Sequence, residues 1–286
     1  TAIALRALAG QVNTATAADS SLRTEHRSIS AGVGRGAIDG GMSEYEFSSV
    51  DGTRCVLLFN PLPYRRAEIV ETTIWEGYEP WTDQQAVEFT VTAPDGTVSG
   101  AQVLERGGYW GHRFIRIAYP AQIPGIGYTV QVVRETDDES AQGETAQIGL
   151  SHECNYALYE RGPEGLENSL VRMDLDPSSG GIKRFTVKES GLDLIGTGGP
   201  VRPVLRYLLE RARPMSAWEI EHGGSEIDPE LRKLERLQDG PLTAGIRAEY
   251  RIADSTAVLT YKLKQNDPNL YLDFEIEWNE RGGEEI

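Results

Sequence analysis

Alternation of apolar and polar residues is clearest near the end of the chain. Over residues 270–278 every even position is apolar and every odd position is tyrosine or an acidic residue. A period of two predicts a β-strand with one buried and one wet face, so the apolar side chains, Trp278 included, are expected in a core. Residues 171–175 and 246–252 alternate in the same way. These runs predict a large β-sandwich over residues 148–286.

Shorter strand-like runs, separated by turn sequences, fill residues 44–135. An apolar run at 55–59 is followed by Asn60-Pro61-Leu62-Pro63, whose prolines cannot donate to a strand ladder. The sequence Pro94-Asp95-Gly96-Thr97 is a second turn, in which proline presets φ and glycine accepts a positive φ. Short strands and turns at this spacing predict a small β-sandwich.

Three other segments complete the expected order of elements. Residues 1–14 predict a helix, because Leu5, Leu8, Ala9 and Val12 share one helical face. Residues 15–43 are a Gly-rich connector, and residues 136–147 are an acidic, polar linker. The predicted fold is therefore mainly β, with two β-sandwich domains after a short N-terminal helix. Residues 231–237 fit a short helix and a strand equally well, and both interpretations stay open.

Charge and composition exclude some classes of partner. The 286 residues carry a net charge of −16, so no basic face for nucleic acid or an anionic membrane is expected. No stretch reaches the roughly 20 apolar residues of a membrane helix. Two cysteines, Cys55 and Cys154, make no disulfide framework, and a single bridge between them stays open. No signal peptide is visible, so a cytoplasmic location is predicted. The chain begins at Thr1, and both of its ends are expected to be cut from something longer.

The residue patterns assign no catalytic or metal-binding residue. None of the four histidines lies in a metal-ligand spacing, and no nucleophile elbow or phosphate-binding loop is present. His152 and Cys154 would lie on the same side of a strand, but without further spaced ligands a pair that holds no metal is favoured.

Aromatic residues give the only candidates for substrate binding. Tyr109 and Trp110 lie in a Gly-rich loop at residues 107–112. Exposed rings beside glycine turns can stack on sugar faces. The alternative, that these rings cover the edges of a sandwich, also fits, because strands are rich in aromatic residues.

Several segments, taken in order, resemble the C-terminal β-rich region of glycoside hydrolase family 38, the α-mannosidases. They are VLLFNPLPYRR at 56–66, IPGIGYT at 123–129, LENSLV at 166–171 with the turn 176–182, AWEI at 217–220, DGPLTA at 239–244, and the strand at 270–280. Tyr64 stands where the family more commonly has tryptophan. The helix expected at residues 1–14 is similar to the last helix of the family's three-helix bundle.

The resemblance implies a parent enzyme with an N-terminal β/α catalytic domain, a helical bundle and then these β domains. The last domain would be similar to a galactose-mutarotase-like supersandwich, truncated here because the family's later strands are missing. Family members are retaining, zinc-dependent α-mannosidases, whose catalytic carboxylates and zinc ligands come from the N-terminal part. Those ligand motifs have no match in this chain, so zinc is expected only in the missing part of the parent.

The implied partners are the chain's own catalytic domain and mannose-containing glycans, together with a homo-oligomer. On this interpretation the chain itself is a non-catalytic scaffold. The alternatives are a free-standing carbohydrate-binding β-sandwich that uses Tyr109 and Trp110, and an interaction module without a ligand. A mutarotase-like enzyme is a further alternative, which would need a histidine and a carboxylate in one cleft.

Overall fold

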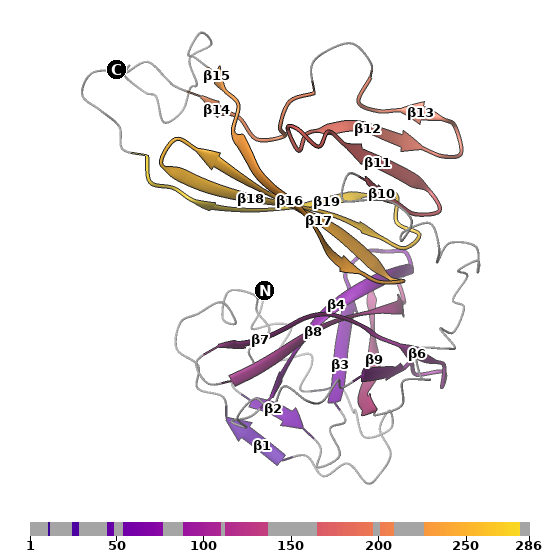
Figure 1. Ribbon diagram of the computed structural model, residues 1–286. Coiled ribbons are helices and arrows are strands. Elements are labelled where there is room, and N and C mark those ends of the chain that lie inside the picture. Colours follow the sequence, from indigo (N-terminus) through magenta and orange to yellow (C-terminus); the bar gives the residue numbers. More distant parts are fainter. Residues whose placement is uncertain are drawn as a thin grey trace, which may run out of the picture. The chain divides into compact units, whose positions relative to one another are not determined.

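The computed structural model describes residues 11, 25–28, 45–48, 54–76, 88–109, 112–136, 165–196, 201–208 and 226–280 (Figure 1). Within these residues every regular element is a β-strand in an antiparallel sheet, so the mainly β class is confirmed. The described part of the chain contains no helix, and hence none long and apolar enough to cross a membrane. The predicted helix at residues 1–14 and the linker at 136–147 lie almost entirely outside the described residues.

The chain divides into two compact units, Thr1–Gly149 and Leu150–Ile286, here called the first and second unit. In the first unit a short pair joins β1 (Glu25–Ser28) to β2 (Tyr45–Ser48). Strand β1 therefore lies inside the stretch that was predicted to be a Gly-rich connector.

Two further sheets of the first unit share one core. The four-stranded sheet has the order β3 (Arg54–Asn60), β9 (Gly127–Thr136), β5 (Glu88–Thr92) and β6 (Val98–Gly100). The three-stranded sheet has the order β4 (Arg66–Glu76), β8 (His112–Ile123) and β7 (Gln102–Tyr109). Buried side chains from both sheets, such as Val91 and Ile117, belong to one hydrophobic cluster. Burial of this apolar surface holds the two sheets together.

The second unit also contains two four-stranded sheets. One has the order β10 (Gly165–Glu167), β11 (Val171–Leu175), β12 (Ile182–Val187) and β13 (Leu192–Asp193). The other has the order β16 (Glu230–Asp239), β17 (Thr243–Ile252), β18 (Ser255–Lys264) and β19 (Leu270–Glu277). A two-stranded pair, β14 (Tyr207–Leu208) with β15 (Glu226–Ile227), accompanies them. The open question at residues 231–237 is settled, because they lie within strand β16.

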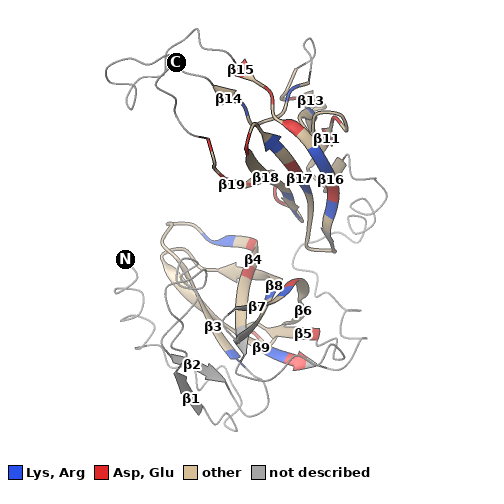
Figure 2. Cartoon of the chain, turned by 60° about the vertical axis from the view of Figure 1, so that its left-hand side comes forward, with Lys and Arg blue, Asp and Glu red and all other residues tan. Residues whose placement is uncertain are grey.

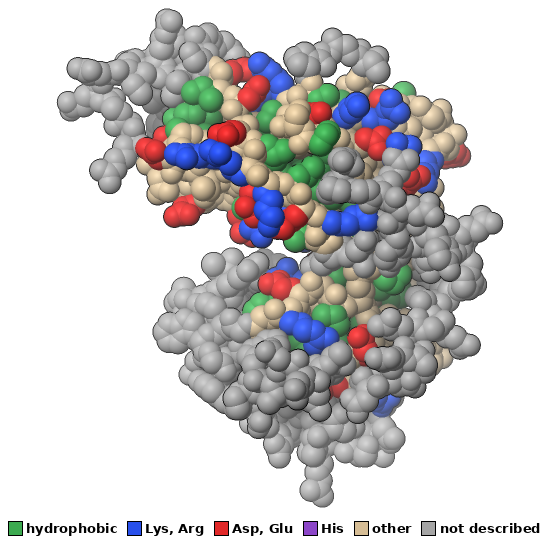
Figure 3. Space-filling model, in the orientation of Figure 1, with side chains coloured by type: hydrophobic (Ala, Val, Ile, Leu, Met, Phe, Trp, Pro, Cys, Tyr) green, Lys and Arg blue, Asp and Glu red, His purple; other side chains and the backbone are tan. Residues whose placement is uncertain are grey.

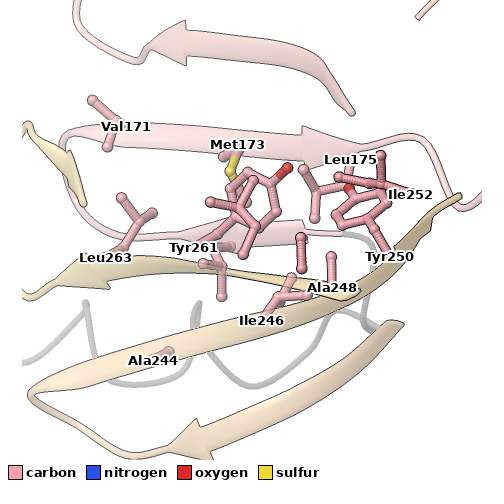
Figure 4. Close-up of a cluster of buried hydrophobic side chains, with 13 residues drawn as sticks. Val171, Met173, Leu175, Ala244, Ile246, Ala248, Tyr250, Ile252, Tyr261 and Leu263 are labelled. Atoms are coloured by element: carbon pink, nitrogen blue, oxygen red, sulfur yellow. The ribbon is translucent and has the colours of Figure 1, made fainter. Parts of the chain in front are cut away.

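Figure 4 shows how the core of the second unit is built. Met173 and Leu175 of β11 point toward Ile246 and Tyr250 of β17 and toward Tyr261 of β18. Along β18 every odd-numbered residue from Ser255 to Leu263 is buried, as expected for a strand that faces another layer. Residues 171–175 pair antiparallel with residues 182–187 across the turn at 176–181.

One expectation about burial is wrong. Residues 270–277 do form strand β19, but its apolar face is exposed, and Trp278 is about half exposed as well. Strand β19 is the last strand of its sheet, and the shared core ends at β18 except for a contact with Leu270. Alternation fixes which face of a strand is apolar, but an edge strand becomes buried only if a second layer reaches it.

Candidate functional site

The predicted sugar platform is placed only by its backbone. Tyr109 is the last residue of β7, and its Cα lies opposite that of His112 in β8. The side chain of Tyr109 and the whole of Trp110 lie outside the described residues. The proposal that these rings stack on sugars therefore stays a prediction.

A different set of exposed rings lies where β3 ends and β9 begins. Tyr64 and Tyr128 are 61% and 49% exposed, and Ile126 beside them is also exposed. The ring of Phe59 lies 6.0 Å from the ring of Tyr128, centroid to centroid, at an angle of 45°. We call Phe59, Tyr64, Ile126 and Tyr128 the Asn60 corner, after the residue that organises it.

Asn60 joins the two turns that carry these side chains. Its buried side-chain amide donates to the carbonyl of Tyr64 at 2.7 Å and to that of Pro124 at 3.1 Å. Its side-chain oxygen accepts a hydrogen bond from the backbone N–H of Leu62 at 3.1 Å. An amide side chain both donates and accepts, so this one residue serves both turns.

Backbone contacts tighten the same corner. The N–H of Ile126 donates to the carbonyl of Leu62 at 2.7 Å. A Cβ on Gly125 would lie 2.6 Å from the carbonyl oxygen of Pro63, so the turns meet closely only because this residue is glycine. Ile126 has a φ of 43°, which is strained for a β-branched residue. The sequence signalled both turns, but it did not indicate that they lie together.

The ionisable residues that the structure describes provide no metal centre. Among the described residues no group of three His, Cys, Asp or Glu side chains could hold a metal ion. Cys55 of β3 is a free thiol, and burial raises its pKa, with a smaller opposing effect of Arg134. A half-buried thiol with a raised pKa is a poor nucleophile. The pair His152 and Cys154 lies outside the described residues.

In the second unit a buried asparagine connects two turns. Asn168 donates to the carbonyls of Lys264 at 2.8 Å and Asp267 at 2.7 Å. Its oxygen accepts from the N–H groups of Leu170 and Val171 at 2.9 and 2.8 Å. This residue therefore links the β10–β11 turn to the β18–β19 turn. Its role is to hold the two turns together and not to bind a ligand.

Comparison with known families finds a match within the second unit. Residues 166–285 match the model of the glycosyl hydrolases family 38 C-terminal domain. The match begins at Leu166 in β10 and extends beyond β19, so it includes both of the unit's four-stranded sheets almost completely. A comparison with curated proteins finds no match. The similar segments at 56–66 and 123–129 lie outside the matched region, and their resemblance stays a prediction.

Proposed function

We propose, from the match of residues 166–285 to the family 38 C-terminal domain, that the chain is the C-terminal β-rich part of a retaining, zinc-dependent α-mannosidase. The parent enzyme would hydrolyse terminal α-mannosides. The observation that supports this proposal is the family match, which agrees with the order of the sequence segments that resemble the family.

In this proposal the chain acts as a scaffold and not as the catalyst. Retaining hydrolysis needs two carboxyl groups roughly 5 to 5.5 Å apart, and in the family these and the zinc ligands come from the N-terminal part. The side chains described in this chain do not fit a zinc site, since no three potential ligands gather. We therefore assign no step of the reaction to a residue of this chain. Its partners would be its own catalytic domain and mannose-containing glycans.

We extend the proposal to the fold, in which each unit would be a β-sandwich. Two sheets of the second unit share one hydrophobic cluster, which supports a sandwich similar to that of galactose mutarotases. The cluster shared by the two sheets of the first unit supports a second, smaller sandwich. Both would present a rigid surface to the catalytic domain.

An activity assay tests the proposal. Purified chain should not hydrolyse an aryl α-mannoside, with or without added zinc. A longer protein, expressed from the gene together with the region upstream of the Thr1 codon, should hydrolyse it with retention of anomeric configuration. Robust turnover by the chain alone, or an inactive longer protein, would contradict the proposal.

A second candidate function is carbohydrate binding by the first unit. The exposed Tyr64 and Tyr128, held by Asn60 on two joined turns, favour this candidate because rigid rings lose little entropy when a sugar stacks on them. Titration of the chain with an α-linked mannobiose measures this sugar binding. Binding should be lost in Tyr64→Ala/Tyr128→Ala and retained in the matched variant Tyr271→Ala of the second unit. Loss in Trp110→Ala would instead favour the platform that the sequence predicted.

A further inference from the structure

The four-stranded sheet of the first unit has an apolar surface on the face that points away from the shared core. Val56 of β3 packs against the core cluster, so its neighbours Cys55 and Leu57 point to the opposite face. Val132 and Val130 of β9 lie opposite Cys55 and Leu57 and therefore share this outer face with them. We call Cys55, Leu57, Val130 and Val132 the outer patch.

The outer patch is covered, although it lies outside the shared core. Val130 and Val132 are only 7% and 2% exposed, and neither belongs to the core cluster. Tyr128, further along the same face, is 49% exposed. In the described part of the first unit the three-stranded sheet packs on the opposite face, and β1 and β2 contact mainly each other. The cover of the outer patch therefore comes from residues outside these strands.

The outer patch suits an apolar cover. In β3 and β9 charged residues stand only at the end where β3 begins and β9 finishes, and these are Arg54, Arg134 and Glu135 (Figure 2). By contrast, charged side chains lie between the hydrophobic ones on the face of the second unit seen in Figure 3. A charged segment placed on the outer patch would bury its charges without partners, which costs free energy.

Long segments of the first unit outside its sheets differ in how well they could cover this patch. Residues 12–44 are largely polar or glycine, and residues 137–149 are acidic and polar, so neither fits. Residues 77–87 contain aromatic rings but also a proline and two acidic residues. Residues 1–10 are the most apolar and contain one charged side chain, and Gln11 after them is exposed in a turn. Residues 1–10 therefore fit the outer patch best.

The apolar stripe of residues 1–10 matches the outer patch in length. Leu5, Leu8 and Ala9 share one face of a helix. A helix rises about 1.5 Å per residue, so this stripe spans about 6 Å. A strand rises about 3.4 Å per residue, so Val130 and Val132 lie about 7 Å apart along β9. A helix this short is marginal by itself in water, so packing against the sheet would also stabilise it.

We propose that residues 1–10 form a helix that packs on the outer patch, with Leu5 and Leu8 over Val130 and Val132. The helix would be a third layer of the first unit and would hold the segment that enters this unit against β3 and β9. Burial of apolar surface on both sides drives the contact. This inference uses only residues of this chain and does not depend on the glycosidase proposal.

Cross-linking tests which segment covers the outer patch. In a chain with Cys154→Ser and Leu8→Cys, the only thiols are at positions 8 and 55, and a short bismaleimide should join them within one chain. Ala7→Cys, on the opposite side of the helix, is the matched control and should cross-link at least tenfold less. Failure of Leu8→Cys to cross-link would overturn the proposal. So would a cross-link from Trp81→Cys in its place, which would assign the cover to residues 77–87, or a cross-link between two chains.

Reactivity of the Cys55 thiol tests the contact in the full chain. With Cys154→Ser present, Leu5→Asp/Leu8→Asp should raise the rate at which an aromatic disulfide reagent modifies Cys55 at least tenfold, because aspartates cannot pack on the apolar patch. Ala7→Asp, the matched control, should stay within twofold of the unchanged chain. Circular dichroism should show the same strand content in all three chains. An unchanged rate in the double variant, or an equal rise in Ala7→Asp, would overturn the proposal.

Discussion

The phenol of Tyr261 donates a 2.7 Å hydrogen bond to the backbone carbonyl of Gly180. Tyr261 belongs to β18, and Gly180 lies in the turn between β11 and β12, so the bond joins the two sheets of the second unit across their core. Burial raises the pKa of Tyr261 above its usual value, so the phenol stays neutral and available as a donor.

Removing this hydroxyl should destabilise the second unit. Tyr261→Phe keeps the ring in the core but leaves the buried carbonyl of Gly180 without this donor. Loss of a buried partner lowers the free energy of unfolding by about 1–3 kcal/mol. Denaturant unfolding measures this decrease in the free energy of unfolding. Tyr271→Phe is the control, because its hydroxyl is exposed, and its effect should stay within about 0.5 kcal/mol. Equal effects of the two variants would show that the bond across the core contributes little.

Gly180 should tolerate substitution less well than another glycine with the same backbone angle. Gly180 has a φ of 67° and Gly191 has a φ of 68°, and a positive φ disfavours alanine by roughly 1–2 kcal/mol at either position. A Cβ at position 180 would also overlap the Tyr250 hydroxyl, whereas one at position 191 meets no atom within 4 Å. Gly180→Ala should therefore lower the melting temperature clearly more than Gly191→Ala. Equal shifts would mean that the core relaxes around the added methyl group.

Asn168 should be more important for stability than its position in a turn indicates. Asn168→Ala removes a buried side chain that donates to two backbone carbonyls and whose oxygen accepts from two N–H groups. We expect the free energy of unfolding to fall by about 3 kcal/mol, the upper part of the range for buried polar networks. Chemical unfolding followed by fluorescence measures it. Ser169→Ala, which loses one hydrogen bond to Asn266, is the control and should have a smaller effect.

The sequence predicted the strands better than it predicted their surroundings. Alternation at residues 270–278 located β19 correctly, but its burial depends on a covering layer that no local pattern encodes. Asn168 stood in a segment that resembled a family motif, yet two of its four hydrogen bonds reach Lys264 and Asp267, 96 and 99 positions away. The Asn60 corner was missed for the same reason, since its two turns are far apart in the chain. Pairing of β3 with β9 and of β4 with β8 brings them together.

Tyr119 should make the stability of the first unit depend on pH in the alkaline range. Burial raises the pKa of Tyr119 from 10.0 to about 12, with a smaller opposing effect of the hydrogen bond to Thr72. The pKa is higher in the folded state, so the stabilisation is complete below pH 10 and is lost as pH rises toward 12. The loss should be on the order of 2 kcal/mol. Denaturant unfolding at several pH values across this range measures the free energy of unfolding. Tyr119→Phe should flatten its decline with pH, whereas the exposed control Tyr128→Phe should not. A decline that is unchanged in Tyr119→Phe would assign the pH dependence to other residues.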